Sequence, residues 1–328
     1  MALPASGQHP SPPPSTANQP SRHVREPAAV DYGRPVEFGI SVVPNASELD
    51  ALRVAVTAAD RSGLDLVGIQ DHPYQWRFLD TWMLMASLLA QTERVRVFAD
   101  VTNLPLRAPA MLANEAATLD VLSGGRFELG LGAGGFWDAI AAMGGPRRTP
   151  GQAVEAFEEA IAIIRQAWSG ERSVHFEGTH YAAHGYHPGP LPAHQIAIWV
   201  GAYRPRMLRL IGRLADGWIP SLGIIGIPEI AEAQQVIDAA AAAAGRESSE
   251  IRRMVNVSGS IGPRASGGAF SGSVEDWVEL LAGWVTDVGL DTFILWPVDA
   301  DPGQVETFGT EVAPRVRAEV DSRRESRS

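Results

Sequence analysis

His72 lies at the end of a predicted strand, where its side chain could transfer a proton. Asp71 and His72 follow Gln70 at the end of Leu66–Ile69, a short and continuously apolar run that is typical of a buried strand. Imidazole titrates near neutral pH, so His72 at a strand end can give a proton to a reacting substrate or take one from it. Asp71 points to the opposite side of an extended chain and is not automatically the carboxylate that orients the ring. A histidine that merely packs under a loop is the alternative.

A second group of residues suits the edge of a polar ring system. They are Asp100 and Val101, the last residues of the run Val95–Val101, and Thr102 and Asn103, which follow it. The hydroxyl and amide groups among them offer hydrogen-bond donors and acceptors to a ring of that kind. An ordinary turn is the commoner fate of a Thr-Asn pair, and it is the alternative here.

A third strand-like run ends at the start of a predicted helix. The residues at this junction are Gly201, Ala202, Tyr203 and Arg204, followed by Pro205. Proline is favoured in the first turn of a helix, where free backbone N–H groups can bind a phosphate without any lysine. The guanidinium of Arg204 adds positive charge to such a site.

Three glycines have the spacing of a dinucleotide-binding loop. Gly130, Gly132 and Gly135 follow the run Phe127–Leu131 as GxGxxG. The context is wrong, because three strand-like runs precede this one and the next segment breaks at residues 144–146, too early for a full helix. We therefore interpret the glycines as places where the backbone approaches packing atoms or a ligand closely.

Most of the histidines gather in one stretch that proline and glycine interrupt. They are His175, His180, His184, His187 and His194. A metal site needs ligands that converge in a defined geometry, and no carboxylate joins these histidines at a helical ligand spacing. The sequence therefore predicts a surface insertion and no metal.

The scaffold that positions these groups alternates strands and helices. The strand-like runs are Val36–Val43, Leu66–Ile69, Val95–Val101, Phe127–Leu131, Ile196–Val200, Gly217–Pro220, Met254–Ile261 and Thr292–Trp296. The helical segments are Glu48–Arg61, Asp80–Gln91, Pro109–Leu122, Gln152–Trp168, Arg206–Leu214, Pro228–Ala244, Val274–Val288 and Pro302–Val320. Eight of each in strict alternation predict a parallel (β/α)8 TIM barrel with insertion loops. A doubly wound open sheet uses the same units and is the alternative, with Gly217–Pro220 as the weakest strand.

Long connections and chain ends complete the predicted organisation. Residues 133–151, 170–195 and 262–273 are too long for simple turns, and the first and third follow strands, where loops form walls or lids of a site. Ser47 and Ser273 precede helical segments and are expected to cap them. The Pro-rich residues 1–35 are expected to form a disordered tail and residues 319–328 a frayed end, which leaves 36–318 for the barrel.

Composition excludes several chemistries. The 328-residue chain has no cysteine, and its 27 basic residues are all arginine, so a thiol nucleophile, a Schiff-base lysine and a Walker-type phosphate loop are impossible. A net charge of −11 argues against nucleic-acid or anionic-membrane partners. No apolar stretch is long enough for a membrane span or a secretory signal. We expect a soluble, cytoplasmic protein that acts on a small molecule.

Three stretches resemble the bacterial luciferase-like flavin monooxygenase family. The likeness is greatest to the branch of methylenetetrahydromethanopterin reductase and glucose-6-phosphate dehydrogenase, which uses the 5-deazaflavin coenzyme F-420. The stretches are GIQDHPY (68–74), DVTNLPLRAPAMLANEAATLDVLSGGRFELGLGAG (100–134) and IWVGAYRPRMLRLIGRLADGWIP (198–220). The middle stretch is the most specific, and the likeness extends over about residues 36–297.

The resemblance implies where a flavin would lie. The ring would cross the strand ends beside Asp71 and His72, with a non-proline cis peptide at Asp100–Val101 behind it and bonds from Thr102 and Asn103 to its edge. The remaining contacts implied for the cofactor tail and its phosphate come from Gly130, Gly132, Gly134, Gly201, Ala202, Tyr203 and Arg204.

The resemblance also implies catalytic groups, with one departure. In the sugar-phosphate dehydrogenases of this branch, the residues matching His72 and Trp76 serve the reaction, but their proton-donating glutamate is Gly135 here. The nearest carboxylate is Asp138, and the absence of lysine counts against a sugar phosphate as substrate. We expect an aromatic substrate pocket formed by Trp76, Phe136 and Trp137.

The leading hypothesis is a deazaflavin-dependent oxidoreductase. It would transfer hydride to or from a small, largely apolar organic substrate while His72 manages a proton. The first alternative is an FMN-dependent two-component monooxygenase supplied by a separate flavin reductase, and the second is a non-catalytic flavin-binding relative. Asp-His rather than Glu-His at the second strand favours the deazaflavin. The family also implies a homodimer.

Overall fold

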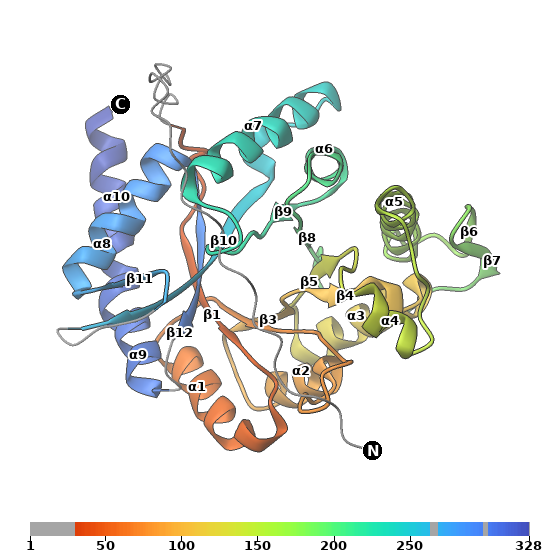
Figure 1. Cartoon of the computed structure of the whole chain (residues 1–328), viewed down its shortest axis with the longest axis horizontal. Helices are drawn as coiled ribbons and strands as arrows, with labels where there is room; N and C mark the ends of the chain where they lie inside the picture. The colour runs from red at the N-terminus through yellow and green to blue at the C-terminus, as the bar shows by residue number, and fades with distance from the viewer. Residues whose placement is uncertain (1–29, 263–267, 298–300, 328) are drawn as a thin grey trace, which may run out of the picture.

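Eight parallel strands form a closed ring (Figure 1). The computed structural model describes residues 30–262, 268–297 and 301–327. The ring consists of β1 (Glu37–Val42), β2 (Leu66–Ile69), β3 (Arg96–Ala99), β5 (Phe127–Gly132), β8 (Ile198–Gly201), β9 (Gly217–Trp218), β10 (Arg252–Ile261) and β12 (Thr292–Pro297). It closes because β9 pairs with β10 and β12 pairs with β1. This closure confirms the predicted barrel and excludes an open sheet. The weakest predicted strand is real but short.

Helices follow the strands and cover the outside of the barrel (Figure 1). They are α1 (Leu49–Arg61), α2 (Thr81–Leu89), α3 (Pro109–Ser123), α4 (Trp137–Ala142), α5 (Pro150–Ala167), α6 (Pro205–Leu214), α7 (Ile227–Ala243), α8 (Val274–Gly283), α9 (Pro302–Thr307) and α10 (Ala313–Arg327). Each predicted helical segment is present, although π-helical turns at Trp284–Val288 and Phe308–Val312 extend or divide the last two. None of the described helices is both long and apolar enough to cross a bilayer.

The C-terminal helix contradicts the predicted frayed end at residues 319–328. α10 continues to Arg327, and Val320 on it is fully buried. Arg324 binds the carboxylate of Asp31 with two hydrogen bonds of 2.8 Å. A few valines at helical spacing are enough to dock α10, and the surrounding arginines and serines hide that pattern in the sequence. Of the predicted disordered tail at residues 1–35, residues 1–29 lie outside the described part of the chain, whereas Asp31 and Tyr32 are held by Arg324 and Asp238, contrary to that prediction.

One of the two expected serine caps is present. The Ser273 hydroxyl accepts the Asp276 N–H at 3.2 Å, and the Asp276 carboxylate accepts the Ser273 N–H at 2.8 Å, which forms a capping box on α8. Ser47 does not cap α1, so that prediction was wrong. Its own N–H instead donates to the side chain of Asn45, because a short 3-10 turn at Ala46–Glu48 precedes the helix.

The long connection at residues 170–195 forms a hairpin beside α5 (Figure 1). Its strands are β6 (Val174–Glu177) and β7 (Ala182–Tyr186). Glu159 of α5 accepts three backbone N–H groups at 2.7–2.8 Å from the hairpin turn, those of Thr179, His180 and Tyr181. Within the described ranges, no three metal-ligating side chains converge, in this hairpin or elsewhere.

A cluster of large apolar side chains fills the barrel interior. Its fully buried members are Leu66, Phe98, Trp199, Ile219, Met254 and Ile294. Val101 and Trp296 are partly buried and pack against this cluster. They also line the cavity at the C-terminal ends of the strands, so the cluster forms the floor of that cavity.

Two short strands extend the rim, namely β4 (Thr102–Asn103), paired with β5, and β11 (Phe270–Gly272), paired with β10.

Candidate active site

A cavity of about 500 Å³ opens at the C-terminal ends of the barrel strands. This is the end at which barrel enzymes place their active sites. Its lining residues are Gln70, His72, Asp100, Val101, Phe136, Gly201, Tyr203, Ile219, Ser221, Leu222, Ile224, Asn256, Ser258 and Trp296. The structure thus brings together His72, the bulge at Val101 and the junction at Gly201, which lie far apart in the sequence.

Val101 forms a bulge in the cavity wall, and glycines make room for it. The Asp100–Val101 peptide bond is cis, as the resemblance implied. A Cβ on Gly132 would lie 2.7 Å from Cγ2 of Val101, and a Cβ on Gly201 would lie 3.1 Å from the same atom. A Cβ on Gly130 would overlap the carbonyl oxygen of Ala99. Gly132 therefore leaves room for Val101, whereas Gly130 leaves room for the backbone of β3, and neither is among the residues that line the cavity.

Gly134, another predicted cofactor contact, is not among the residues that line the cavity. It has a positive φ of 89°, and a Cβ there would lie 2.7 Å from Pro105 and 3.1 Å from the Trp137 ring. Glycine is required at this position by both backbone conformation and packing. Its neighbours are thus side chains of the 3-10 turn at Leu104–Leu106 and of α4.

Asp71 faces away from the cavity and fixes the backbone beside it. Its side chain is fully buried, accepts the Asn103 N–H at 2.9 Å and pairs with Arg107 at 3.4 Å. The guanidinium of Arg107 also reaches Asp80 and lies over the ring of Trp82. Asp71 is therefore placed to hold β4 against the end of β2.

His72 lies at the cavity wall among aromatic side chains. Its Nδ1 is 2.7 Å from the hydroxyl of Tyr74, and its ring meets Phe136 edge-on with the centroids 5.7 Å apart. Burial lowers the pKa of His72 below its ordinary value, although the charge of Asp71 opposes the shift. The imidazole is therefore neutral at pH 7 and can donate one N–H and accept at one nitrogen.

Asp100 lies at the cavity floor in a polar group that the sequence did not predict. Its carboxylate accepts the Ser41 hydroxyl at 3.2 Å and the Asn256 amide at 3.3 Å, and Asn256 also donates to Ser221 at 3.1 Å. Burial raises the pKa of Asp100 to about 6. The pattern that could have revealed these partners is a polar residue between two apolar neighbours in a buried strand, as at Ser41 and Asn256.

Several buried polar atoms near this cavity have no hydrogen-bond partner in the described protein. They are Oγ1 of Thr102, Oδ1 of Asn103, Oδ1 of Asn256 and Nε1 of Trp296. Native proteins rarely leave such atoms unsatisfied. Asn256 and Trp296 line the cavity, and Thr102 and Asn103 directly follow its lining residue Val101, so unpartnered donors and acceptors lie at or beside this space. This arrangement fits a planar ring with polar atoms on its edge, such as a flavin or deazaflavin.

The phosphate end of the predicted site is the start of α6. Arg204 occupies the N-cap position without a side-chain hydrogen bond to the helix, and Pro205 begins the first turn. The carbonyl of Ala202 accepts the Trp218 indole N–H at 2.8 Å, and the Tyr203 hydroxyl accepts the Ser221 N–H at 3.2 Å. These bonds fix the junction while the first N–H groups of the helix remain available for an anion.

The predicted aromatic pocket is only partly assembled. Phe136 lines the cavity and is 63% exposed, and Trp137 packs on Gly134. Trp76 is 84% exposed and lies against the guanidinium of Arg77 rather than in the cavity. Asp138 is exposed and pairs with an arginine, Arg147, so the structure gives this carboxylate no place in the cavity. His72 is thus the predicted proton-handling group that faces the cavity.

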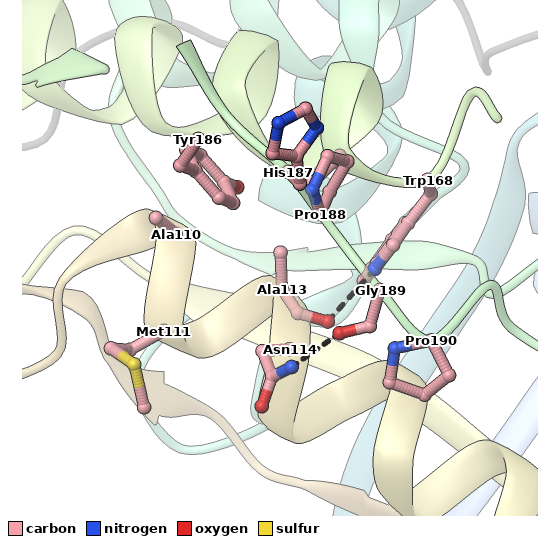
Figure 2. A pocket seen from close by; sticks show the side chains of 11 residues that line it. Ala110, Met111, Ala113, Asn114, Trp168, Tyr186, His187, Pro188, Gly189 and Pro190 are labelled. Atoms are coloured by element: carbon pink, nitrogen blue, oxygen red, sulfur yellow. Dashed lines mark hydrogen bonds between the residues drawn. The ribbon is translucent and has the colours of Figure 1, made fainter. Parts of the chain in front are cut away.

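A second, smaller pocket of about 260 Å³ lies outside the barrel (Figure 2). It is enclosed by the first turns of α3, the C-terminal end of α5 and residues 186–190. Asn114 donates to the carbonyl of Gly189, and the Trp168 indole donates to the carbonyl of Ala113 at 3.0 Å. It contains none of the predicted site residues and no charged side chain apart from the titratable His187. Its polar groups thus serve mainly to attach residues 186–190 to α3.

Comparison with known proteins places the chain in a family. A family model described as luciferase-like monooxygenase matches residues 33–266. The F420-dependent glucose-6-phosphate dehydrogenase of Kineococcus radiotolerans is 32% identical over 200 residues, which are 58% of each chain. The 5,10-methylenetetrahydromethanopterin reductase of Archaeoglobus fulgidus is 31% identical over 217 residues, 64% of this chain and 60% of that one. The matches therefore span less than two thirds of these relatives.

Solved structures show the same fold. An F420-dependent secondary alcohol dehydrogenase superposes with a TM-score of 0.77 at 18% identity, covering 86% of this chain and 99% of that chain. The coenzyme F420-dependent tetrahydromethanopterin reductase of Methanopyrus kandleri gives a TM-score of 0.74 at 19% identity, covering 86% of this chain and 100% of the other. With the barrel, the cis peptide and the family match in agreement, the chain belongs to the luciferase-like monooxygenase family.

Proposed function

We propose that the protein is a deazaflavin (coenzyme F-420)-dependent oxidoreductase that transfers hydride to or from a small, largely apolar organic substrate. The observation that carries the proposal is the cavity lined by His72 and Val101, beside which Thr102 and Asn103 have buried polar atoms without partners. When bound, the deazaflavin supplies or accepts the hydride at C5. The relatives and solved structures whose names include F420 support this choice of cofactor.

The residues of this chain would hold the cofactor at both ends. Thr102 and Asn103 offer the ring edge an unpartnered hydroxyl and amide oxygen, and Val101 supports the rear of the ring. Gly201 and Ala202 lead into the N-terminus of α6, which suits a phosphate. His72 binds the oxygen on the reacting carbon of the substrate and holds a proton there while hydride moves.

The lining of the cavity supports an apolar substrate. Phe136, Ile219, Leu222 and Ile224 contribute apolar surface, and no arginine is among the described residues that line the cavity. A sugar phosphate would leave its charged phosphate without a cationic partner there, which is unfavourable in a partly buried site. We therefore propose an alcohol or carbonyl compound with an apolar body rather than a phosphorylated sugar.

FMN is the rival cofactor, and direct binding separates the two. The oxygenating component of a Pseudomonas putida diketocamphane monooxygenase with bound FMN shares the fold at 20% identity and a TM-score of 0.69, covering 86% of this chain and 99% of that one. Fluorescence titration with oxidised deazaflavin and with FMN should give much tighter binding of the deazaflavin. Preferential FMN binding would support instead a monooxygenase with a separate flavin reductase. Binding of neither would remove the site assignment.

Substitution of His72 tests whether the protein is an enzyme at all. His72→Ala should lower the hydride-transfer rate by roughly 10²-fold or more, since acid–base groups typically contribute that much. Deazaflavin binding should persist, because the ring edge is held by other residues. An unchanged rate with cofactor still bound would favour a non-catalytic flavin-binding protein. The homodimer implied by the family remains part of the proposal, and light scattering of the purified protein tests it.

A further inference from the structure

Tyr74 engages one nitrogen of the His72 ring. Its hydroxyl lies 2.7 Å from Nδ1, and the two residues share a turn closed by the Gln75 N–H donating to the His72 carbonyl at 2.9 Å. The Phe136 ring packs 5.7 Å from the His72 ring and 5.8 Å from the Tyr74 ring, measured between centroids. Nδ1 is therefore occupied by neighbours from its own loop, while the ring lines the cavity.

The direction of this hydrogen bond decides which ring nitrogen carries the proton. A neutral imidazole has one N–H, and it lies on the nitrogen that is not accepting. Burial raises the pKa of Tyr74 to about 12, with Asp71 adding to the rise and a hydrogen bond from Asn103 opposing it. The hydroxyl thus keeps its hydrogen at neutral pH. A phenol O–H is a stronger donor than an imidazole N–H, and an unprotonated imidazole nitrogen is a stronger acceptor than a phenol oxygen, so at 2.7 Å the Tyr74 hydroxyl is the group that donates to Nδ1.

We propose that Tyr74 is a positioning residue that donates to Nδ1 of His72, keeps the imidazole N–H on Nε2 and so presents a hydrogen-bond donor to the substrate oxygen. The inference rests on the proposed function, because that oxygen belongs to the reacting substrate. A neutral imidazole N–H polarises a carbonyl group without carrying charge.

Nitrogen-15 NMR of histidine-labelled protein tests the tautomer without cofactor, substrate or turnover. The His72 resonances are those that disappear in His72→Gln. We expect protonated Nε2 and unprotonated Nδ1 in the wild type, and in Tyr74→Phe a shift of both resonances toward the average of the two tautomers. A wild-type ring protonated at Nδ1, or resonances that do not move in Tyr74→Phe, would overturn the proposal.

Kinetics test the consequence for turnover, with Tyr186→Phe as the matched control. The Tyr186 hydroxyl is buried without a hydrogen-bond partner and lies outside the cavity. Tyr74→Phe should lower kcat about 10- to 100-fold, as expected for a misaligned catalytic group, and leave KM and cofactor Kd within about twofold. The control should match the wild type. A Tyr74→Phe kcat equal to wild type would refute the role in turnover. An inactive wild type would refute the proposed function and leave the NMR test intact.

Discussion

Asp100 should make the protein less stable as the pH rises, and Asp100→Asn should remove that dependence. Burial at the cavity floor raises the pKa of Asp100 from 3.8 to about 6, although hydrogen bonds, from Asn256 first, oppose the shift. A carboxyl with a higher pKa in the folded chain binds its proton more tightly when folded. Its stabilisation is therefore complete below pH 3.8 and is lost as the pH rises through about 6.

The size of the effect follows from the two pKa values. A rise from 3.8 to about 6 corresponds to roughly 3 kcal/mol between the fully protonated and fully ionised limits. About 1.4 kcal/mol of this is lost between pH 5 and pH 8. Asparagine has the same shape and can accept from Ser41, but it does not ionise. The difference in unfolding free energy between the wild type and the variant therefore isolates this one group.

Urea unfolding followed by tryptophan fluorescence, at pH 5 and pH 8 without cofactor, measures that difference. Asp100→Asn should gain about 1.4 kcal/mol relative to the wild type between the two pH values. Asp138→Asn removes an exposed carboxylate that pairs with Arg147 and serves as the control, for which we expect a small difference that changes little with pH. If the unfolding free energies of the wild type and Asp100→Asn differ by the same amount at pH 5 and pH 8, the reasoning is refuted.

Two further substitutions test the packing and the electrostatics. Gly132→Ala should destabilise the protein by about 1–3 kcal/mol, because its Cβ would lie 2.7 Å from a methyl carbon of the bulge. The control is Gly135→Ala, whose Cβ would have no atom within 4 Å, so its thermal unfolding should show no loss of stability. Equal losses of stability in the two variants would argue against the contact between Gly132 and Val101. The carboxylate of Glu128, 3.6 Å from Nε2, outweighs burial and, together with the carboxylate of Asp120 at 2.7 Å from Nδ1, raises the pKa of His194. This stabilisation is present below pH 6.5 and lost as the pH rises through the raised value. His194→Gln should therefore cost more stability at pH 6 than at pH 9, and equal urea midpoint shifts would contradict it.

The fold was predictable because its local signals agree with its global arrangement. Buried strands such as β2 and β5 are short apolar runs. The amphipathic segments between consecutive strands are too long for strands and have the period of helices. Parallel strands place their C-terminal ends together, so His72 and Gly201 could be expected at one cavity before any contact was known. The C-terminal helix escaped prediction because its docking depends on a few valines among arginines and serines.

The parts of the site that escaped prediction depend on closure of the barrel. Ser41 on β1 and Asn256 on β10 meet Asp100 because three strands distant in the sequence converge at the cavity floor. Nothing in the local sequence specifies that convergence. Proximity in sequence was equally misleading for Asp138, which is close to the glycine-containing strand along the chain but turns to solvent at the start of α4.

The bulge at Val101 has a consequence for how this protein can evolve. One side chain occupies space that Gly132 and Gly201 leave empty, so these three positions constrain one another and changes at them are expected to occur together. Phe136 and Ile224 are exposed at the rim and carry no such mutual constraint. A mutant library that varies only these two rim positions should therefore alter substrate range while the cofactor platform is inherited unchanged.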